Sequence, residues 1–412
     1  MQSISVNRVN YLKGSVHISG SKNACLPILC SSIITRGIVV LKNVANITDI
    51  NDICDILRYL NCKVKRRGNR LKVDSTKIQY KSLNINKCSK IRGSYYLIPV
   101  MLYLFNKCEI ALPGGCKIGQ RPIDCHLECF QAFGFSTIIE NNVLYIKSNQ
   151  RKKEVLLSLS KKSVGASINA ILCGLGCEHS IIENLVIEPE GLDLISFLKK
   201  IGFNISFLNN KCIIKSHKQD IKNRITYKII PDRMEAMTFV ILGLLNGRIL
   251  IKGANPSHMK YPLDLLINAK YNLKITKKGI LACKSRGNAF NIKTDIYPLF
   301  PTDMQPLFAI LLAASRGMCV VDETIFENRM QIYYDLLEGG GQINVIENKA
   351  YITGVTEFSP KHFKCKDLRQ GAALLLYIFT YGGSIDNIDI IKRGYDGIFY
   401  KLKLLGANFS LK

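Results

Sequence analysis

One pattern of apolar and polar positions recurs along the chain. An amphipathic helical stretch ends in a glycine or a similar stop, and two short alternating strands joined by a polar turn follow it. The six copies cover residues 57–73, 130–148, 198–216, 267–285, 337–354 and, truncated, 402–412. Because the copies lie about 70 residues apart, which is too long a period for a stacked solenoid, the pattern predicts six α/β subdomains.

Longer apolar stretches lie inside these repeats and are expected to be helices buried on most sides. They cover residues 22–34, 163–176, 233–245, 302–314 and 367–381. We therefore predict an α/β protein of six repeats in two sets of three, with a boundary near residues 229–231.

The composition fits a large folded chain. With 412 residues, 47% of them hydrophobic and 21% charged, the chain can bury a substantial core, which excludes disorder as its main state. The longest apolar runs fall short of a membrane span, and the N-terminus has no secretory signal pattern. We expect a cytoplasmic protein whose 15 cysteines are mostly reduced core residues, without a metal site.

The charge is the unusual feature of the composition. Fifty-seven basic and 31 acidic residues give a formal net charge of +26, which could indicate a nucleic-acid partner. However, the basic residues are mostly scattered, with short clusters at 63–70 and 151–153, and no aromatic platform or nucleic-acid motif accompanies them. We therefore favour a lysine-rich composition over nucleic-acid binding.

A glycine-rich loop between residues 112 and 126 is the strongest candidate for chemistry. It contains Cys116 with Lys117 and Arg121 beside it. Nearby cations lower the pKa of a thiol, so Cys116 is a candidate acid, base or nucleophile. The alternative is one more structural cysteine. The glycine spacing does not fit a nucleotide-binding P-loop.

Charged residues also stand at the expected helix starts. Lys22 and Asn23 open one helix, and Asp303 opens another, where a carboxylate could act as a general base. Arg329, Asp367-Leu-Arg369 and Lys392-Arg393 have similar settings. Each alone could be a helix cap or a surface ion pair, but together they suggest a site for phosphate and carboxylate groups.

Nine segments occur together in one order: SGSKNACLPIL, LPGGCKIGQRPIDCH, KSVGAS, EPE, PDRMEA, FPTDMQ, FENR, DLR and RGYD. This set resembles the UDP-N-acetylglucosamine 1-carboxyvinyltransferases, a family of enolpyruvyl transferases, over residues 6–412. The resemblance implies a two-domain inside-out α/β barrel. It also implies that residues 22–229 form one domain and that residues 1–21 and 230–412 form the other.

The resemblance implies a reaction as well. Members of this family move the enolpyruvyl group of phosphoenolpyruvate to the 3′-hydroxyl of UDP-N-acetylglucosamine and release phosphate. They do so by addition and elimination through a tetrahedral intermediate, in the first step of peptidoglycan synthesis. No cofactor or metal is implied, and the expected partners are the two small-molecule substrates, without nucleic acid, membrane or an obligate protein.

The resemblance assigns roles to individual residues. The catalytic residues that it implies are Cys116, Asp303, Lys22 and Arg393. Among them, Cys116 is the loop acid, which can carry a covalent phosphoenolpyruvate adduct. Its substrate-binding group also includes Asn23, Arg92, Arg121, Pro122, Ile123, Asp124, Cys125, Lys161, Ser163, Val164, Gly165 and Ile325. Its supporting group is Asp367, Arg369 and Arg329. In the family, the loop closes over the substrates.

The sequence leaves two other hypotheses about function open. The first is the sister transferase that acts on shikimate 3-phosphate, and the second is a degraded, non-catalytic or nucleic-acid-binding relative. Departures from the family pattern at Asn46, Thr48 and Ile187 put binding strength in question. At residues 269–271, the fourth repeat lacks the usual Leu-Gly stop.

Overall fold

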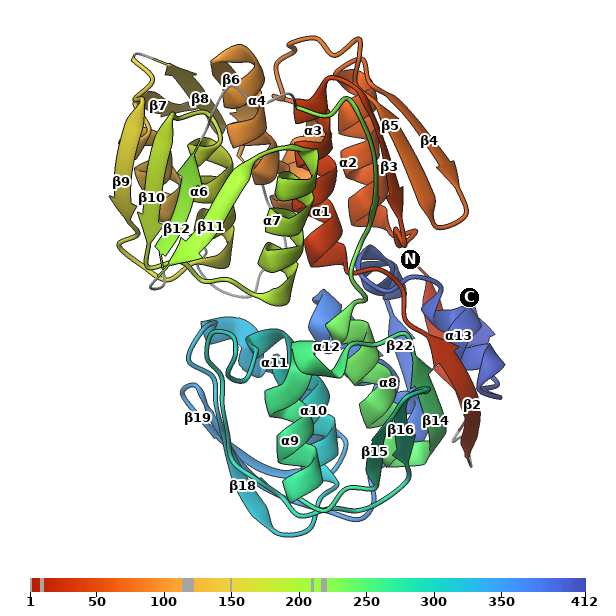
Figure 1. Cartoon of the computed structure of the whole chain (residues 1–412). Coiled ribbons are helices and arrows are strands. Elements are labelled where there is room, and N and C mark those ends of the chain that lie inside the picture. The colour runs from red at the N-terminus through yellow and green to blue at the C-terminus, as the bar shows by residue number, and fades with distance from the viewer. Residues whose placement is uncertain (1, 8–10, 113–121, 149, 209–210, 216–220) are drawn as a thin grey trace. The chain divides into compact units, whose positions relative to one another are not determined.

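The chain divides into two compact units in a computed structural model, which describes residues 2–7, 11–112, 122–148, 150–208, 211–215 and 221–412 (Figure 1). The described residues of 20–230 form the first unit. The described residues of 1–19 and 231–412 form the second unit, so the described part of the chain crosses between the units twice. The sequence predicted these crossings after residues 21 and 229.

Each unit has three small sheets among its described residues. In the first unit, one sheet has the strand order β13 (Arg224–Lys228), β3 (Ile38–Lys42), β5 (Arg70–Asp74), β4 (Lys63–Arg67). The second sheet has the order β6 (Lys107–Ala111), β8 (Val143–Ser148), β7 (Phe135–Glu140). The third has the order β11 (Asn204–Leu208), β12 (Lys211–Lys215), β10 (His179–Glu183), β9 (Glu154–Ser158).

In the second unit, one sheet has the strand order β15 (Leu273–Thr276), β16 (Gly279–Cys283), β14 (Gly247–Lys252), β2 (Leu12–His17). The second sheet has the order β17 (Ile292–Lys293), β18 (Met318–Asp322), β20 (Lys349–Thr353), β19 (Gln342–Ile346). The third has the order β21 (Lys361–Lys364), β22 (Gly383–Asp386), β1 (Ser3–Val6), β23 (Ser410–Leu411). The six sheets confirm the six predicted α/β repeats.

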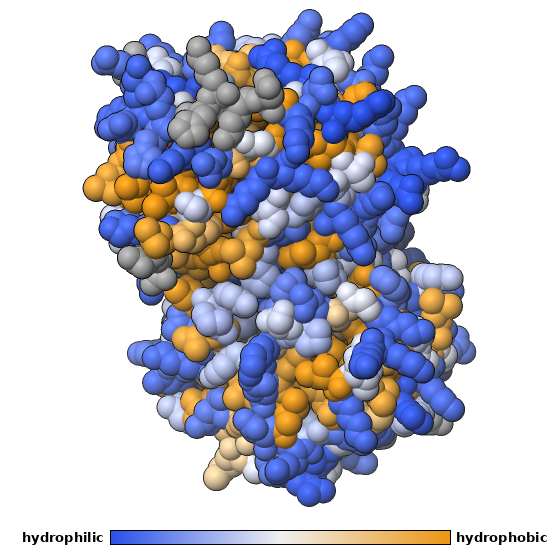
Figure 2. All heavy atoms as spheres, viewed as in Figure 1, coloured by the Kyte–Doolittle hydropathy of each residue, from blue (hydrophilic) through white to orange (hydrophobic). Residues whose placement is uncertain are grey.

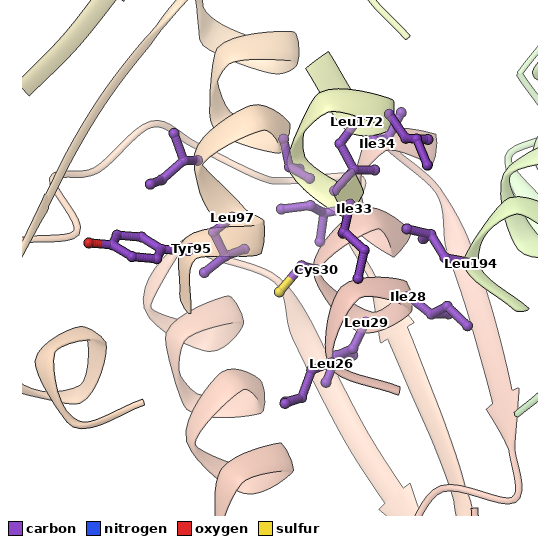
Figure 3. Close-up of a cluster of buried hydrophobic side chains, with 14 of the residues drawn as sticks. Leu26, Ile28, Leu29, Cys30, Ile33, Ile34, Tyr95, Leu97, Leu172 and Leu194 are labelled. Atoms are coloured by element: carbon purple, nitrogen blue, oxygen red, sulfur yellow. The ribbon is translucent and has the colours of Figure 1, made fainter. Parts of the chain in front are cut away.

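Apolar helices fill the inside of each unit. These are α1 (Lys22–Ser31), α4 (Leu97–Phe105) and α6 (Val164–Gly174) in the first unit, and α8 (Arg233–Asn246), α10 (Gln305–Ala313) and α12 (Leu368–Tyr381) in the second. Every residue of α8, α10 and α12 is buried, and these three helices pack on one another. Figure 3 shows side chains of α1 packed with Leu97, Leu172 and Leu194 in the first unit.

Amphipathic helices complete the repeats. They are α2 (Thr48–Tyr59), α5 (Asp124–Ala132), α7 (Pro189–Ile201), α9 (Lys260–Asn268), α11 (Gln331–Glu338) and α13 (Ile398–Leu404), with a short α3 (Asn86–Lys90). The five predicted buried helices are confirmed, and all except α8 are shorter than expected. Residues 32–34 and 302–304, which we expected to be α-helical, lie in the 3₁₀ turns η1 (Ser32–Thr35) and η4 (Thr302–Met304).

The six helix stops share a positive backbone φ. It falls on the first residue after α7, Gly202, and on the second residue after each of the other five helices: Asn61, Gly134, Lys270, Gly340 and Gly406. The fourth repeat therefore keeps the stop geometry although lysine stands where glycine is usual. Lys270 has φ 64°, and its N–H and that of Tyr271 donate to Ile267 O and Leu266 O.

Replacing Lys270 by Gly is expected to raise the free energy of unfolding by about 0.5–1 kcal/mol, because glycine adopts a positive φ without a Cβ penalty. Urea unfolding would measure this change. Gly406→Ala is the matched control: its φ is +87° and no atom lies within 4 Å of an added Cβ, so it should lose a similar amount without a clash. An unchanged or lowered stability in Lys270→Gly would show that the lysine is not strained.

Candidate active site

The first predicted cation stands at the start of α1. The Ser21 hydroxyl accepts a hydrogen bond from the Ala24 N–H at 3.4 Å and so caps the helix, which leaves Lys22 and Asn23 in the first turn. The Lys22 ammonium donates to a carboxylate oxygen of Asp49, at the start of α2, at 3.1 Å, and both side chains are largely buried. The ion pair fixes the position of Lys22. Sequence reasoning missed Asp49.

A second group of predicted residues stands at the start of α6. The Ser163 hydroxyl caps this helix by accepting from the Ala166 N–H at 3.3 Å, and Val164 and Gly165 form the first turn. A Cβ on Gly165 would lie 3.1 Å from the His126 ring. This ring is buried and forms a 2.9 Å hydrogen bond with Asn169. The close packing favours glycine at position 165, beside backbone N–H groups of the kind that favour anions.

The strip before α5 meets Arg92. Pro122 and Asp124 are exposed, whereas Ile123 and Cys125 are half-buried. Arg92, which opens η2 (Arg92–Tyr96), donates to Pro122 O at 3.5 Å, and its guanidinium lies 5.8 Å from the centre of the Tyr95 ring. Lys161 is exposed just before α6. Cys116 and Arg121 lie outside the described residues.

In the second unit, two arginines bind the carboxylate of Asp303, in η4. Arg329 donates to one of its carboxylate oxygens at 3.0 Å. Arg369 donates to the other, from Nε at 3.0 Å and from Nη2 at 2.9 Å. The Arg329 and Arg369 side chains are 2% and 8% exposed, whereas Asp303 is 27% exposed. Two buried arginines therefore hold a carboxylate that still reaches solvent.

The cluster around Asp303 stabilises the charged form of Arg369. Burial lowers the pKa of Arg369, but Asp303, together with Tyr395 and Asp232, opposes this effect, so that the pKa is raised overall. Asp367 caps α12 and accepts from the backbone N–H of Arg369 at 2.8 Å, which helps to place that arginine. The structure thus brings Asp303, Arg329, Asp367 and Arg369 together.

Arg329 has unused donors. Its Nε and Nη1 are buried and make no hydrogen bond with the described residues, and its guanidinium lies 5.4 Å from the centre of the Phe326 ring. Ile325 is 37% exposed, and its N–H donates to the buried Glu323 carboxylate at 2.9 Å. Arg393, at the end of η6 (Ile388–Arg393), is half-buried.

Sequence reasoning also missed a buried ionic cluster beside the first crossing of the chain. The Glu235 carboxylate accepts from the Ser19 N–H at 2.9 Å and from the Lys401 ammonium, which donates to the Ser19 hydroxyl as well. Burial raises the pKa of Glu235 to about 7, although Lys401 opposes the shift. The sequence does contain a sign of this cluster, because Glu235 is the single acidic residue within the apolar stretch 233–245.

The described part of the chain has no metal-ligand cluster, and most of its thiols are buried. No group of three or more His, Cys, Asp or Glu side chains there could hold a metal ion. Twelve of its 14 cysteines are buried, and burial raises the pKa of Cys54, Cys177 and Cys319 to about 11, so these thiols are inert at neutral pH. Among the described helices, none is long and apolar enough to cross a membrane.

The chain is similar to known proteins over almost its whole length. Residues 6–402 match the family model described as EPSP synthase (3-phosphoshikimate 1-carboxyvinyltransferase). The chain is 36% identical over 407 residues to a protein of Buchnera aphidicola and 35% identical over 415 residues to one of Clostridium botulinum, with 97% and 99% of each chain covered. Both relatives are named UDP-N-acetylglucosamine 1-carboxyvinyltransferase.

Solved structures agree on the fold. The enolpyruvyl transferase NikO from Streptomyces tendae is similar with a TM-score of 0.88 at 18% identity, over 100% of this chain and 98% of the other. An EPSP synthase from Acinetobacter baumannii is similar with a TM-score of 0.79 at 14% identity, over the whole of both chains. The predicted α/β fold class is confirmed.

Proposed function

This chain belongs to the enolpyruvyl transferases, and we propose that it transfers the enolpyruvyl group of phosphoenolpyruvate to the 3′-hydroxyl of UDP-N-acetylglucosamine with release of phosphate. The relatives at 34–36% identity, which cover almost the whole chain, support the nucleotide sugar over shikimate 3-phosphate as the acceptor. The enzyme is a cytoplasmic transferase that begins peptidoglycan synthesis.

The observation that carries the proposal is the Asp303 cluster. A general base must keep a fixed position and an open face toward the proton that it removes. Arg329 and Arg369 fix both carboxylate oxygens of Asp303, and the side chain remains 27% exposed. Asp303 accepts the proton of the 3′-hydroxyl as the sugar oxygen forms a bond to C2 of phosphoenolpyruvate.

The addition step also needs a proton at C3. The thiol of Cys116 donates it, so that the double bond of phosphoenolpyruvate becomes the C2–O and C3–H bonds of a tetrahedral intermediate. In the elimination step, C3 loses a proton and the bond between C2 and the phosphate oxygen breaks. Inorganic phosphate leaves, and the enol ether of the nucleotide sugar remains.

Cations stabilise the negative charge of phosphate and carboxylate in this sequence. Lys22, Arg121 and Arg393 take this role, with Asn23 beside Lys22. Asp49 positions the Lys22 ammonium through their 3.1 Å ion pair. The two unused donors of Arg329 suit a further anionic group of the substrates.

The nucleotide sugar binds along two described helix starts of the first unit. Arg92 contacts the sugar nucleotide, Pro122–Cys125 contact the uridine end together with Arg121, and residues 161–165 supply capping groups and backbone N–H groups at α6. Ile325, in the second unit, gives an apolar contact to the sugar nucleotide. Asp367 and Arg369 support Asp303.

Replacing Gly165 by Ala is expected to raise the KM for UDP-N-acetylglucosamine about tenfold with kcat within a factor of two, since the new Cβ must displace His126 or the first turn of α6. Steady-state kinetics would measure both constants. Gly191→Ala in α7 is the matched control, because the nearest atom to its new Cβ lies at an ordinary 3.6 Å. An equal KM effect in both variants would contradict the local explanation.

A phosphate-release assay with purified protein tests the acceptor. We expect release from phosphoenolpyruvate only when UDP-N-acetylglucosamine is present, and no release with shikimate 3-phosphate. The opposite dependence would assign the chain to the sister reaction. If neither acceptor led to phosphate release and the protein bound RNA tightly and in a salt-dependent way, the non-catalytic alternative would be supported.

A further inference from the structure

The outer face of the β13-β3-β5-β4 sheet carries an unusual concentration of positive charge. Along these strands, buried residues such as Val39, Leu71 and Val73 alternate with residues that point outward. Of the twelve outward positions, one is acidic, Asp74, and three are uncharged. The other eight are basic and exposed, and we call them the basic face: Lys42, Lys63, Lys65, Arg67, Arg70, Lys72, Arg224 and Lys228.

Strand register places these cations against one another. Arg67 lies opposite Arg70, and Lys65 lies opposite Lys72. Lys42 lies opposite Lys228 on the neighbouring strand pair. Like charges at directly opposed positions destabilise a sheet. None of the eight forms an ion pair with the described residues. Asp74 attracts Lys63 and Lys72 but is the one carboxylate among the twelve outward positions, so most of this repulsion is not offset within the face.

A lysine-rich composition does not explain this face, since it would affect all six sheets alike. The outer face of the β11-β12-β10-β9 sheet has two cations, Lys211 and Lys215, and two carboxylates, Glu154 and Glu183. The next most basic sheet in the described chain, β15-β16-β14-β2, has four outward cations: Lys13, Arg248, Lys252 and Lys274. In Figure 2, the surface over β4 and β5 is mainly hydrophilic, whereas hydrophobic residues gather over β9–β12.

We propose that the basic face docks this protein on the anionic phospholipid surface of a membrane. The eight cations form a two-dimensional array, about 5 Å apart across strands and about 7 Å apart along them, which suits a layer of headgroups. None of the twelve outward side chains is aromatic, Asn or Gln, so the face has neither stacking platforms nor amide groups to contact bases. These features favour a lipid surface over a nucleic acid.

The attachment is peripheral and electrostatic. The outward positions include only two aliphatic side chains, Ile38 and Val40, both half-buried, so little apolar surface enters the bilayer. Each Lys or Arg close to an anionic leaflet strengthens binding by about fivefold, and salt screens the attraction within about 10 Å at 0.1 M. The proposal therefore requires binding that depends on anionic lipid and disappears at high salt. It is independent of the proposed enzymatic function.

Co-sedimentation of the purified full-length protein with vesicles tests the proposal. We expect binding to vesicles of phosphatidylcholine with one third phosphatidylglycerol at about 0.1 M salt, and none to pure phosphatidylcholine or at about 1 M salt. The face variant combines Lys65→Gln, Arg67→Gln, Arg70→Gln and Lys72→Gln. It should bind anionic vesicles at least tenfold more weakly and still release phosphate in the enzyme assay.

The matched control removes the same charge from the other basic sheet: Lys13→Gln, Arg248→Gln, Lys252→Gln and Lys274→Gln. It should bind vesicles within about threefold of the unmodified protein. Equal losses in the two variants would overturn the proposal, because net charge rather than the basic face would then govern binding. Absence of vesicle binding would overturn it too, as would RNA that displaces the protein from vesicles at equal phosphate concentration.

Discussion

Replacing Asp303 by Asn is expected to lower kcat by about 10²–10⁴-fold, the range typical of a lost general base, with much smaller changes in substrate binding. The amide keeps the shape of the carboxylate and can still accept one hydrogen bond, but it cannot take the proton of the 3′-hydroxyl. Stopped-flow or steady-state phosphate release would measure kcat, and calorimetry would measure binding of UDP-N-acetylglucosamine.

The variant also has a structural cost, because Arg369 would lose the negative charge that offsets its burial. Asp322→Asn controls for loss of a partly exposed ion-paired carboxylate: Asp322 is 28% exposed and lies 3.8 Å from Lys349. We expect near-normal turnover in this control. Weaker substrate binding in Asp303→Asn without a fall in kcat would contradict the role of Asp303 as base.

Replacing Cys116 by Ala is expected to reduce turnover at neutral pH by about 10²-fold or more, because the loop would lose the acid that protonates C3. The same change should remove the rapidly alkylated thiol. Most of the cysteines in the described chain are buried, and several have a raised pKa, so they should react slowly. Mass spectrometry after brief treatment with a thiol-alkylating epoxide would locate the label.

Cys283→Ala is the control for this experiment, since Cys283 is half-buried in β16, outside the proposed site. It should keep both turnover and the labelled thiol. If Cys116→Ala turned over substrate at the normal rate, the proton donor would have to be another group.

Local features of the sequence predicted much of the fold. The apolar runs gave the buried helices, and Ser163 and Asp367 at their starts are caps in the structure. The recurring helix, stop and hairpin pattern predicted the six repeats, because glycine, asparagine and turn residues determine the backbone conformation of only a few neighbouring positions. The parallel partners, such as β13 on β3 and β2 on β14, come from strands about 190 and 240 residues away and left no local pattern.

The same distinction applies to the site. Lys22 and Asp303 stood out because each opens a helix, but their partners are distant in sequence. Asp49 is 27 residues from Lys22, and Arg369 is 66 residues from Asp303. The charge shows this most clearly. We expected the basic residues to be scattered, whereas strand pairing gathers eight of them, including four from the 63–70 cluster, on one sheet face.

The reaction proposed for this chain forms an enol ether on the nucleotide sugar. Its most direct test is NMR and mass analysis of the product made by purified protein from phosphoenolpyruvate and an equal mixture of UDP-N-acetylglucosamine and shikimate 3-phosphate. We expect one enolpyruvyl group on the 3′-oxygen of UDP-N-acetylglucosamine and unchanged shikimate 3-phosphate. Enolpyruvyl shikimate 3-phosphate, or both acceptors unchanged, would contradict it.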